Sequence, residues 1–192
     1  MYQKYQTEAL VLGNRASGEA DKSIALYTED FGLVRARARG VRKESSKMRY
    51  SLQNYSYAQV GLIRGARDWR IAGASVIAGI DGASAGIAAF ARLSKLALRL
   101  IAGEEPNPYL FGALRDAHGT LFQDTGTAEK IAAIELLCAA RILYALGYIS
   151  SEALETALFT HTMYAEPHLV EAETLQKKLL SSVNQAMAET QL

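Results

Sequence analysis

Apolar and charged positions alternate strictly in the sequence that follows Gly32. The alternating residues are Val34, Ala36 and Ala38 on the one hand, and Arg35, Arg37 and Arg39 on the other. A period of two is typical of a half-buried strand, because successive side chains of a strand point to opposite faces. We therefore predict a strand whose small apolar residues face the core. Its three arginines form a row on the other face, with neighbours about 6.6 Å apart.

Other short apolar runs in the first 80 residues are also typical of strands, and they are separated by turn residues such as Gly18 and Gly32. The predicted strands are Glu8–Leu12, Ser23–Thr28, Tyr55–Ile63 and Trp69–Ile77. Connections of hairpin length favour an antiparallel sheet or a small barrel over βαβ units. Five short strands in about 75 residues have the size of an OB-fold, whose strands two and three commonly bind nucleic acid.

After Gly82 the apolar residues recur at helical spacing instead. The predicted helices are Ser84–Ala102, a helix that Asn107 can cap and Pro108 can begin, Ala128–Leu146 with Gly147 as its stop, Ser151–Thr160 and Ala172–Glu189. The predicted fold class is therefore α+β. We expect an OB-fold nucleic-acid-binding domain over residues 1–80 and an all-helical domain over residues 81–192.

The net charge of +1 conceals an asymmetry between these two regions. Residues 1–74 carry 13 Lys and Arg against 7 Asp and Glu, which is a net +6, whereas residues 75–192 carry 8 against 13, a net −5. Such an asymmetry indicates a basic binding module joined to a region with another task.

Composition sets the remaining bounds. With a hydrophobic content of 49% the chain can build a packed core. Cys138 is the only cysteine, which excludes an internal disulfide and a cysteine-based zinc site. We find no apolar run long enough for a signal-peptide core or a membrane span, so we expect a soluble, cytoplasmic protein.

The candidate nucleic-acid-binding residues are a lysine of the first polar loop, Gly13–Lys22, and the basic residues of the arginine strand and of the loop that follows it. They are Lys22, Arg35, Arg37, Arg39, Arg42, Lys43, Lys47 and Arg49. A charge run is usually a solvated face balanced by interspersed acids. Here Glu44 is the only acid between Leu33 and Tyr50, so we favour contact with phosphates, which arginine grips with its planar fork. Tyr50, Tyr55, Tyr57 and Trp69 are weaker candidates for stacking on bases, since aromatic residues of strands more often belong to the core.

Patterns that would indicate catalysis or cofactor binding are weak. Gly82-Ala83-Ser84-Ala85-Gly86 matches the nucleophile motif of hydrolases, but that motif requires a parallel sheet, and Ser84 is more simply a helix N-cap. The loop from Gly13 to Lys22 has the wrong spacing for a phosphate-binding loop. His118, His161 and His168 lack metal-ligand spacing. We expect no enzyme activity, no metal and no cofactor.

Taken in order, the N-terminal residues resemble the RecO family of recombination mediators. The matching segments are Ala9–Leu12, Gly18–Lys22, Leu26–Thr28 with Gly32, Ala38–Lys43, Ser46–Arg49 and Leu52-Gln53. In the helical half the resemblance is confined to Leu143–Tyr148. Many members carry four zinc-binding cysteines after that segment, whereas this chain continues with Ile149–Glu152, so no zinc site is expected.

The resemblance implies an N-terminal OB-fold, a helical C-terminal domain, and binding of single- and double-stranded DNA. Proteins of this family anneal complementary strands, act with RecR, and help to load RecA onto DNA coated by single-strand binding protein. By this resemblance we predict a DNA-binding recombination mediator of DNA repair, in the cytoplasm and associated with the nucleoid. The alternatives are a generic OB-fold module that binds single-stranded DNA or RNA without mediator activity, and a small hydrolase that uses Ser84.

Overall fold

The structure is a computed structural model that describes residues 3–66, 68–80, 84–123, 126–154 and 156–189. The chain divides into two compact units. The first consists of Met1–Ile80 together with Ala102–Asn107, and the second of Asp81–Ile101 together with Pro108–Leu192. Ala102–Asn107 lies between two helices in the chain but belongs to the N-terminal unit, whereas the predicted division was a single boundary between residues 80 and 81.

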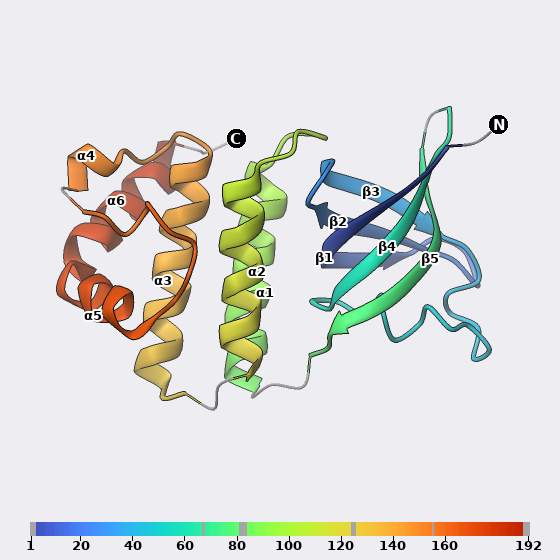
Figure 1. Cartoon of the computed structure of the whole chain (residues 1–192), viewed down its shortest axis with the longest axis horizontal. Coiled ribbons are helices and arrows are strands. Elements are labelled where there is room, and N and C mark those ends of the chain that lie inside the picture. Colours follow the sequence, from blue (N-terminus) through green and yellow to red (C-terminus); the bar gives the residue numbers. More distant parts are fainter. Residues whose placement is uncertain (1–2, 67, 81–83, 124–125, 155, 190–192) are drawn as a thin grey trace. The chain divides into compact units, whose positions relative to one another are not determined.

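The N-terminal unit is a closed barrel of five strands (Figure 1). The strands are β1 (Lys4–Ala16), β2 (Lys22–Thr28), β3 (Gly32–Ala38), β4 (Tyr57–Arg64) and β5 (Trp69–Ala78). Their order around the barrel is β1-β2-β3-β5-β4, and β1 closes it by pairing with β4. All pairs are antiparallel except β3 with β5. This is the arrangement of an OB-fold, and it confirms the predicted α+β class.

Strand β1 is longer than predicted. The polar stretch after Leu12 was interpreted as a loop, but β1 continues to Ala16 and leaves only Ser17–Asp21 as the connection to β2. The strand has two partners, because its first half pairs with β4 and its second half with β2, with a bulge between Val11 and Gly13. Backbone pairing thus extends the strand through residues whose side chains carry no apolar signal. Gly18, in the connection, has a φ of +83°, as a turn residue should.

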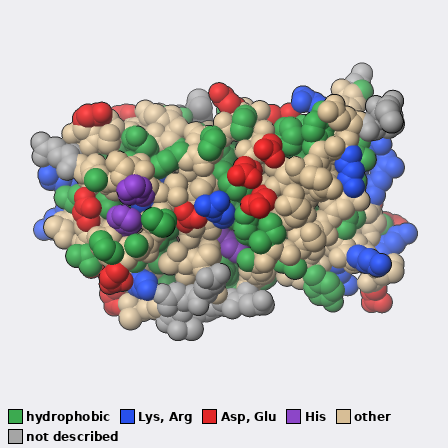
Figure 2. All heavy atoms as spheres, in the orientation of Figure 1, with side chains coloured by type: hydrophobic (Ala, Val, Ile, Leu, Met, Phe, Trp, Pro, Cys, Tyr) green, Lys and Arg blue, Asp and Glu red, His purple; other side chains and the backbone are tan. Residues whose placement is uncertain are grey.

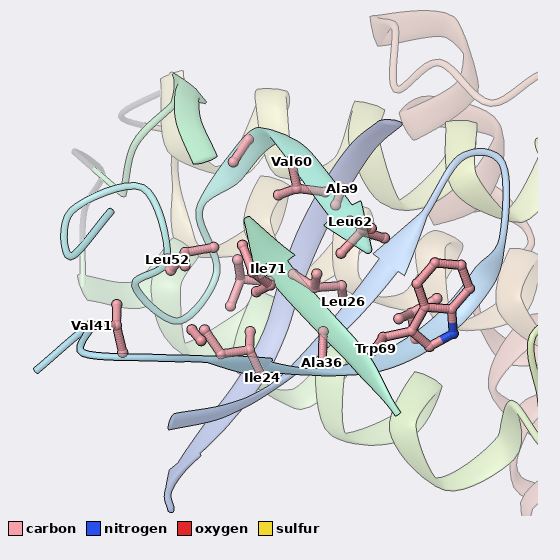
Figure 3. Packing of buried hydrophobic residues seen from close by; sticks show 14 residues of the cluster. Ala9, Ile24, Leu26, Ala36, Val41, Leu52, Val60, Leu62, Trp69 and Ile71 are labelled. Atoms are coloured by element: carbon pink, nitrogen blue, oxygen red, sulfur yellow. The ribbon is translucent and has the colours of Figure 1, made fainter. Parts of the chain in front are cut away.

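The inward side chains of the strands form the barrel core (Figure 3). Among them are Ala9, Ile24, Leu26, Val34, Ala36, Val60, Leu62 and Ile71. Trp69 lies at one end of this core, while Val41 and Leu52, from the β3–β4 connection, lie at the other (Figure 3). The basic connection therefore reaches into the core through two apolar residues, and this anchors it to the barrel.

The segment Ala102–Asn107 packs on the barrel near Trp69. The indole N–H of Trp69 donates to Glu104 Oε1 at 2.8 Å, and the backbone N–H of Leu33 donates to the Gly103 carbonyl at 3.3 Å. Gly32 has a φ of +65°, and a Cβ on it would lie 2.2 Å from the Glu105 carbonyl oxygen. Glycine is thus required at position 32 both by the backbone conformation and by the close approach of this segment.

The second unit is helical. Its elements are α1 (Ser84–Leu100), α2 (Pro108–Gln123), α3 (Ala128–Ala145), α4 (Ser151–Leu154), α5 (Glu166–Thr174) and α6 (Gln176–Glu189). The first three helices pack on one another, and α5 and α6 pack against α3. As predicted, α2 begins at Pro108 and α3 ends before Gly147, which has a φ of +80°. No helix in the described ranges is both long and apolar enough to cross a membrane.

Two predicted helices in the last third of the chain were wrong in extent. The helix expected over Ser151–Thr160 ends at Leu154, and the helix expected from Ala172 is instead two helices that meet at Leu175. The first of these begins earlier, with Pro167 in its first turn, where proline is favoured. In residues 156–165 the carbonyls of Leu158 and Thr162 accept hydrogen bonds from the side chain of Arg141 on α3, which compete with helical hydrogen bonds.

Arg141 is fully buried and has no acidic partner among the described residues. Its Nε and Nη2 donate to the Leu158 carbonyl at 3.1 and 3.0 Å, and its Nη1 donates to the carbonyls of Thr162 and Met163 at 2.7 and 3.1 Å. Its guanidinium carbon lies 4.6 Å from the ring centroid of Tyr164. One side chain thus holds the non-helical segment in place. The nearby Cys138 on α3 is fully buried, and burial raises the pKa of its thiol to about 12.

Candidate nucleic-acid interface

The arginines of β3 lie on the outer surface of the barrel, as the alternating pattern predicted. At most 1% of the surface of Val34, Ala36 and Ala38 is exposed, whereas Arg35, Arg37 and Arg39 are exposed to solvent. Because side chains on one face of a strand repeat about every 6.6 Å, the three guanidinium groups form a row of fixed positive charge along β3 and its end.

Lys22 does not share this face, in contrast to its predicted place in a loop next to the arginines. It is the first residue of β2, and it pairs with Ala38, whose side chain points into the barrel. Residues directly opposite each other in an antiparallel pair point to the same face of the sheet. Lys22 therefore lies half-buried at the open end of the barrel, on the inward side, and the arginine row is on the outward side.

The register instead brings two arginines that the sequence analysis missed into line with β3. Arg15 on β1 pairs with Ser23 on β2, Ser23 pairs with Arg37 on β3, and Arg37 pairs with Arg70 on β5. This row runs across four strands, spaced about 4.8 Å apart, and crosses the β3 row at Arg37. The alternation of apolar and charged residues at Trp69, Arg70 and Ile71 could have predicted that Arg70 points outward. Arg15 could not be placed in this way, because it lies in the part of β1 that was interpreted as a loop.

The connection between β3 and β4 carries the rest of the predicted basic residues on a series of turns. Lys43, Lys47 and Arg49 are exposed. The turns are closed by backbone hydrogen bonds, from Lys43 to Gly40, from Ser46 to Lys43 and from Arg49 to Ser46. Since Val41 and Leu52 anchor this connection in the core, its charges are held next to the barrel and not on a free arm.

Arg42 combines exposure with a structural contact. Its Nη1 donates to the Gly18 carbonyl at 2.9 Å, and its backbone N–H donates to the Ala20 carbonyl at 3.0 Å. Asp21 makes a similar link, because its Oδ1 accepts from the Gly40 N–H at 2.9 Å. The β1–β2 and β3–β4 connections are thereby tied together, which fixes the geometry of the basic surface.

No acid among the described residues forms an ion pair with the predicted basic residues. Within the described ranges, the ion pairs of the barrel unit join Arg64 to Glu104 and Arg70 to Asp68, and none involves the eight predicted residues. In the space-filling view, Lys and Arg side chains gather over the barrel (Figure 2). We call Arg15, Arg35, Arg37, Arg39, Arg42, Lys43, Lys47 and Arg49 the basic surface. Its charges are available for an external polyanion.

Of the four aromatic residues considered for stacking, Tyr50 is the one that is open to solvent, with 72% of its surface exposed. Trp69 belongs to the core, the interpretation that the sequence favoured for aromatic residues of strands. It is 4% exposed and packs against Tyr5 and Phe31 with ring centroids 5.8 and 5.3 Å away. Tyr57 is half-buried and its hydroxyl donates to Glu8.

The structure does not support the hydrolase-like motif or a histidine metal site. Gly82 and Ala83 of the hydrolase-like motif lie outside the described residues, and α1 begins at Ser84. His161 and His168 do come together, with ring centroids 6.0 Å apart. In the described part of the chain, however, no three His, Cys, Asp or Glu side chains form a group that could hold a metal ion.

Comparison with known proteins gives a family match and several relatives. The family model described as Recombination protein O N terminal matches residues 1–75. Proteins named DNA repair protein RecO are 38% identical over 61 residues in Desulfitobacterium hafniense and 36% identical over 73 residues in Dehalococcoides mccartyi. The one from Heliobacterium modesticaldum is 41% identical over 61 residues.

These alignments cover 32%, 38% and 32% of this chain, and only 22%, 29% and 22% of the respective relatives. The chain thus matches less than a third of the length of each relative, and the residues that the family model matches, 1–75, include the barrel strands β1 to β4 and the basic surface. Over residues 1–75, the chain is thus similar to the N-terminal domain of the RecO family.

Proposed function

We propose that this protein binds DNA through the basic surface and promotes the annealing of complementary single strands in DNA repair. The observation that carries the proposal is the row of three exposed arginines, two on β3 and Arg39 directly after it, which have no acidic partner among the described residues and stand on an OB-fold similar to the N-terminal domain of the RecO family. An OB-fold commonly binds single strands on the face of strands two and three, and β3 is part of that face.

The proposed mechanism is electrostatic and needs no catalytic residue. The basic surface neutralises phosphates of one strand, and a complementary strand then approaches with less repulsion. Phosphate contacts of this kind position the strand without reading its sequence, as annealing of arbitrary sequences requires. We therefore propose that the protein is not an enzyme and that it works without metal or cofactor.

By analogy with the family, we also propose that the protein acts in the cytoplasm, at the nucleoid, with RecR and single-strand binding protein, and so assists the loading of RecA. The helical unit is the candidate region for these protein contacts. Double-stranded DNA is a further ligand of the basic surface in this proposal, because its phosphates offer the same charge.

The test is the annealing rate of complementary oligonucleotides across a salt series, in parallel with the affinity for one of the strands. If about six phosphates are contacted, the logarithm of the affinity falls against the logarithm of salt concentration with a slope near −4. Replacing Arg35, Arg37 and Arg39 by alanine should flatten this slope by about two and slow annealing in proportion.

A matched control removes the same charge from the helical unit, where Lys95, Lys177 and Lys178 are exposed. Their triple alanine variant should leave both the slope and the annealing rate unchanged. An unaltered slope in the arginine variant would show that the row is only a solvated face, and the proposal would fail.

One observation favours a second candidate, a single-strand-binding module for DNA or RNA without mediator activity. The family match ends at residue 75 and leaves the helical unit unmatched. Tight binding without faster annealing would support this alternative.

A further inference from the structure

A groove on the outer surface of the barrel has no role in the proposed function so far. It has a volume of about 370 Å³ and lies over β1, β4 and β5. Its lining consists of Gln6, Gln59, Gly61, Gly73, Ala74 and Ser75. The register places Gln6 opposite Gly61 and Gly61 opposite Gly73, so a glycine pair at the centre of two adjacent strands forms its floor.

Neither glycine is required by the fold. Both lie outside the left-handed φ region that favours glycine. A Cβ on Gly73 would meet no atom within 4 Å, and the nearest atom to a Cβ on Gly61 would be the flexible Cε of Lys4, at 3.0 Å. Glycine within a strand costs about 0.5–1 kcal/mol relative to alanine, and it often marks a place where a ligand approaches the backbone. The space above Gly73 is therefore open, whereas the Lys4 stem and the Gln6 amide lie over Gly61, with the amide 3.5 Å from such a Cβ.

The groups around this floor are suited to a planar ligand with hydrogen-bonding edges. Gln6 and Gln59 present side-chain amides, which can each donate and accept, and neither has a hydrogen-bond partner within the described residues. Ser75 adds a hydroxyl, and Lys4 brings a positive charge to the edge. The one acid next to Gln59 across the strands is Glu8, which accepts a hydrogen bond from Tyr57. Among the lining side chains the only apolar one is that of Ala74, so an apolar protein side chain would gain little by entering.

The groove is separate from the β3 arginines. In the strand order β1-β2-β3-β5-β4, the central strand of the groove is β4, whose neighbours are β5 and β1. Strand β3 has β2 and β5 as neighbours and makes no pair with β4. A ligand in the groove can therefore be bound while the arginine row holds phosphates.

We propose that this groove binds one unpaired nucleobase of a single strand, which lies flat on the open backbone at Gly73, beside the Gln6 amide. The Gln6 and Gln59 amides bond its edge, and Lys4 meets the adjoining phosphate. The proposal rests on the proposed function for the class of its ligand. Its consequence is that the barrel contacts an unpaired base at one place and the phosphate backbone at another, as a protein that presents bases for pairing requires.

Backbone and side-chain amide resonances of the isotope-labelled full chain, followed by nuclear magnetic resonance during titration with deoxynucleoside monophosphates, test the proposal. We expect saturable shifts at Gln6, Gln59, Gly61 and Gly73 at millimolar concentrations. Gly73→Val should abolish them, because valine fills the open space above the floor without a clash and suits a strand. The matched control is Ala72→Val, which adds the same kind of side chain at the exposed neighbouring position of β5. It should retain the shifts.

A second variant, Gln59→Ala, should weaken nucleotide binding about tenfold while the barrel stays folded. Absence of groove shifts in the wild type, or equal shifts in Gly73→Val, would overturn the proposal, and the groove would then belong to another ligand such as a protein segment. If the protein binds oligonucleotides but the groove resonances do not shift, only this inference is overturned and the proposed function stands. A third outcome combines two results: mononucleotides shift the groove resonances, but the β3 arginine substitutions leave the affinity for oligonucleotides unchanged. This outcome would support the groove as a base-binding site and contradict the proposed function.

Discussion

The barrel and the helical unit use arginine in opposite ways. On β3, three arginines are exposed, and their donors have no acidic partner among the described residues. On α3, Arg141 is fully buried, and its guanidinium donates four hydrogen bonds to three backbone carbonyls. The comparison shows that charge alone does not identify a binding residue. A surface arginine whose donors are free can serve a ligand, whereas a buried arginine with satisfied donors serves the fold.

The largest effect that this comparison predicts is on the free energy of unfolding of Arg141→Met. The substitution leaves buried carbonyls of Leu158, Thr162 and Met163 without donors, and each such group costs about 1–3 kcal/mol. We expect a loss of about 3–5 kcal/mol, measured by urea denaturation with circular dichroism. Arg92→Ala is the control, since Arg92 is 58% exposed and paired with Glu135, and an exposed pair contributes less than about 1 kcal/mol. Equal losses in the two variants would refute the clamp role of Arg141.

A smaller effect is expected from Cys138, which lies one turn before Arg141 in α3. Burial raises the pKa of this thiol to about 12 in the folded protein, from about 9 for an unperturbed thiol. Above pH 9 the unfolded chain has therefore lost a proton that the folded chain retains, so stability falls as pH rises. The slope from this group approaches about 1.4 kcal/mol per pH unit between pH 9 and 12.

Cys138→Ala should remove that part of the slope, and denaturation curves at pH 8, about 9 and about 10 would measure it. Tyr109, whose pKa burial raises to about 12, contributes only above about pH 10, so the lower part of the window belongs to the thiol. The same pH dependence in both proteins would mean that the thiol is not protected from solvent.

The smallest effect on stability is expected for the β3 variant in which Arg35, Arg37 and Arg39 are replaced by alanine. Surface substitutions away from structural contacts usually change stability by no more than about 0.5 kcal/mol each. Removal of like charges from one row can even be slightly stabilising. We therefore expect the urea midpoint to stay close to that of the wild type while nucleic-acid affinity falls. A large loss in the free energy of unfolding would show that these arginines also stabilise the fold, and would contradict the distinction drawn between them and Arg141.

The strands were largely predictable because their signal is local. A period of two in consecutive residues determines which side chains share a face, so the outward direction of the β3 arginines followed directly from the sequence. The polar end of β1 was missed because its pairing with β2 depends on backbone hydrogen bonds, which do not require apolar side chains and so give no hydrophobic pattern in the sequence. Trp69 was open to two interpretations, and only the barrel closure showed that it belongs to the core.

The C-terminal helices were less predictable for a physical reason that Arg141 illustrates. Local propensity favours a helix after Ser151, but a side chain from α3 captures the carbonyls of Leu158 and Thr162, and this competes with helical hydrogen bonds. Such a contact joins residues about 20 positions apart, and no local pattern records it.

The sequence by itself determined the α+β class, the RecO resemblance and the arginine row, because composition and periodicity act over neighbouring residues. Tertiary structure decided which charges stand together. The pairing of β1, β2, β3 and β5 aligned Arg15 and Arg70 with Arg37 and turned Lys22 to the inner side of the barrel. It also set Gly61 opposite Gly73 and so opened the groove. Strand register joins residues that are far apart in the chain, and it exists only once the barrel has closed.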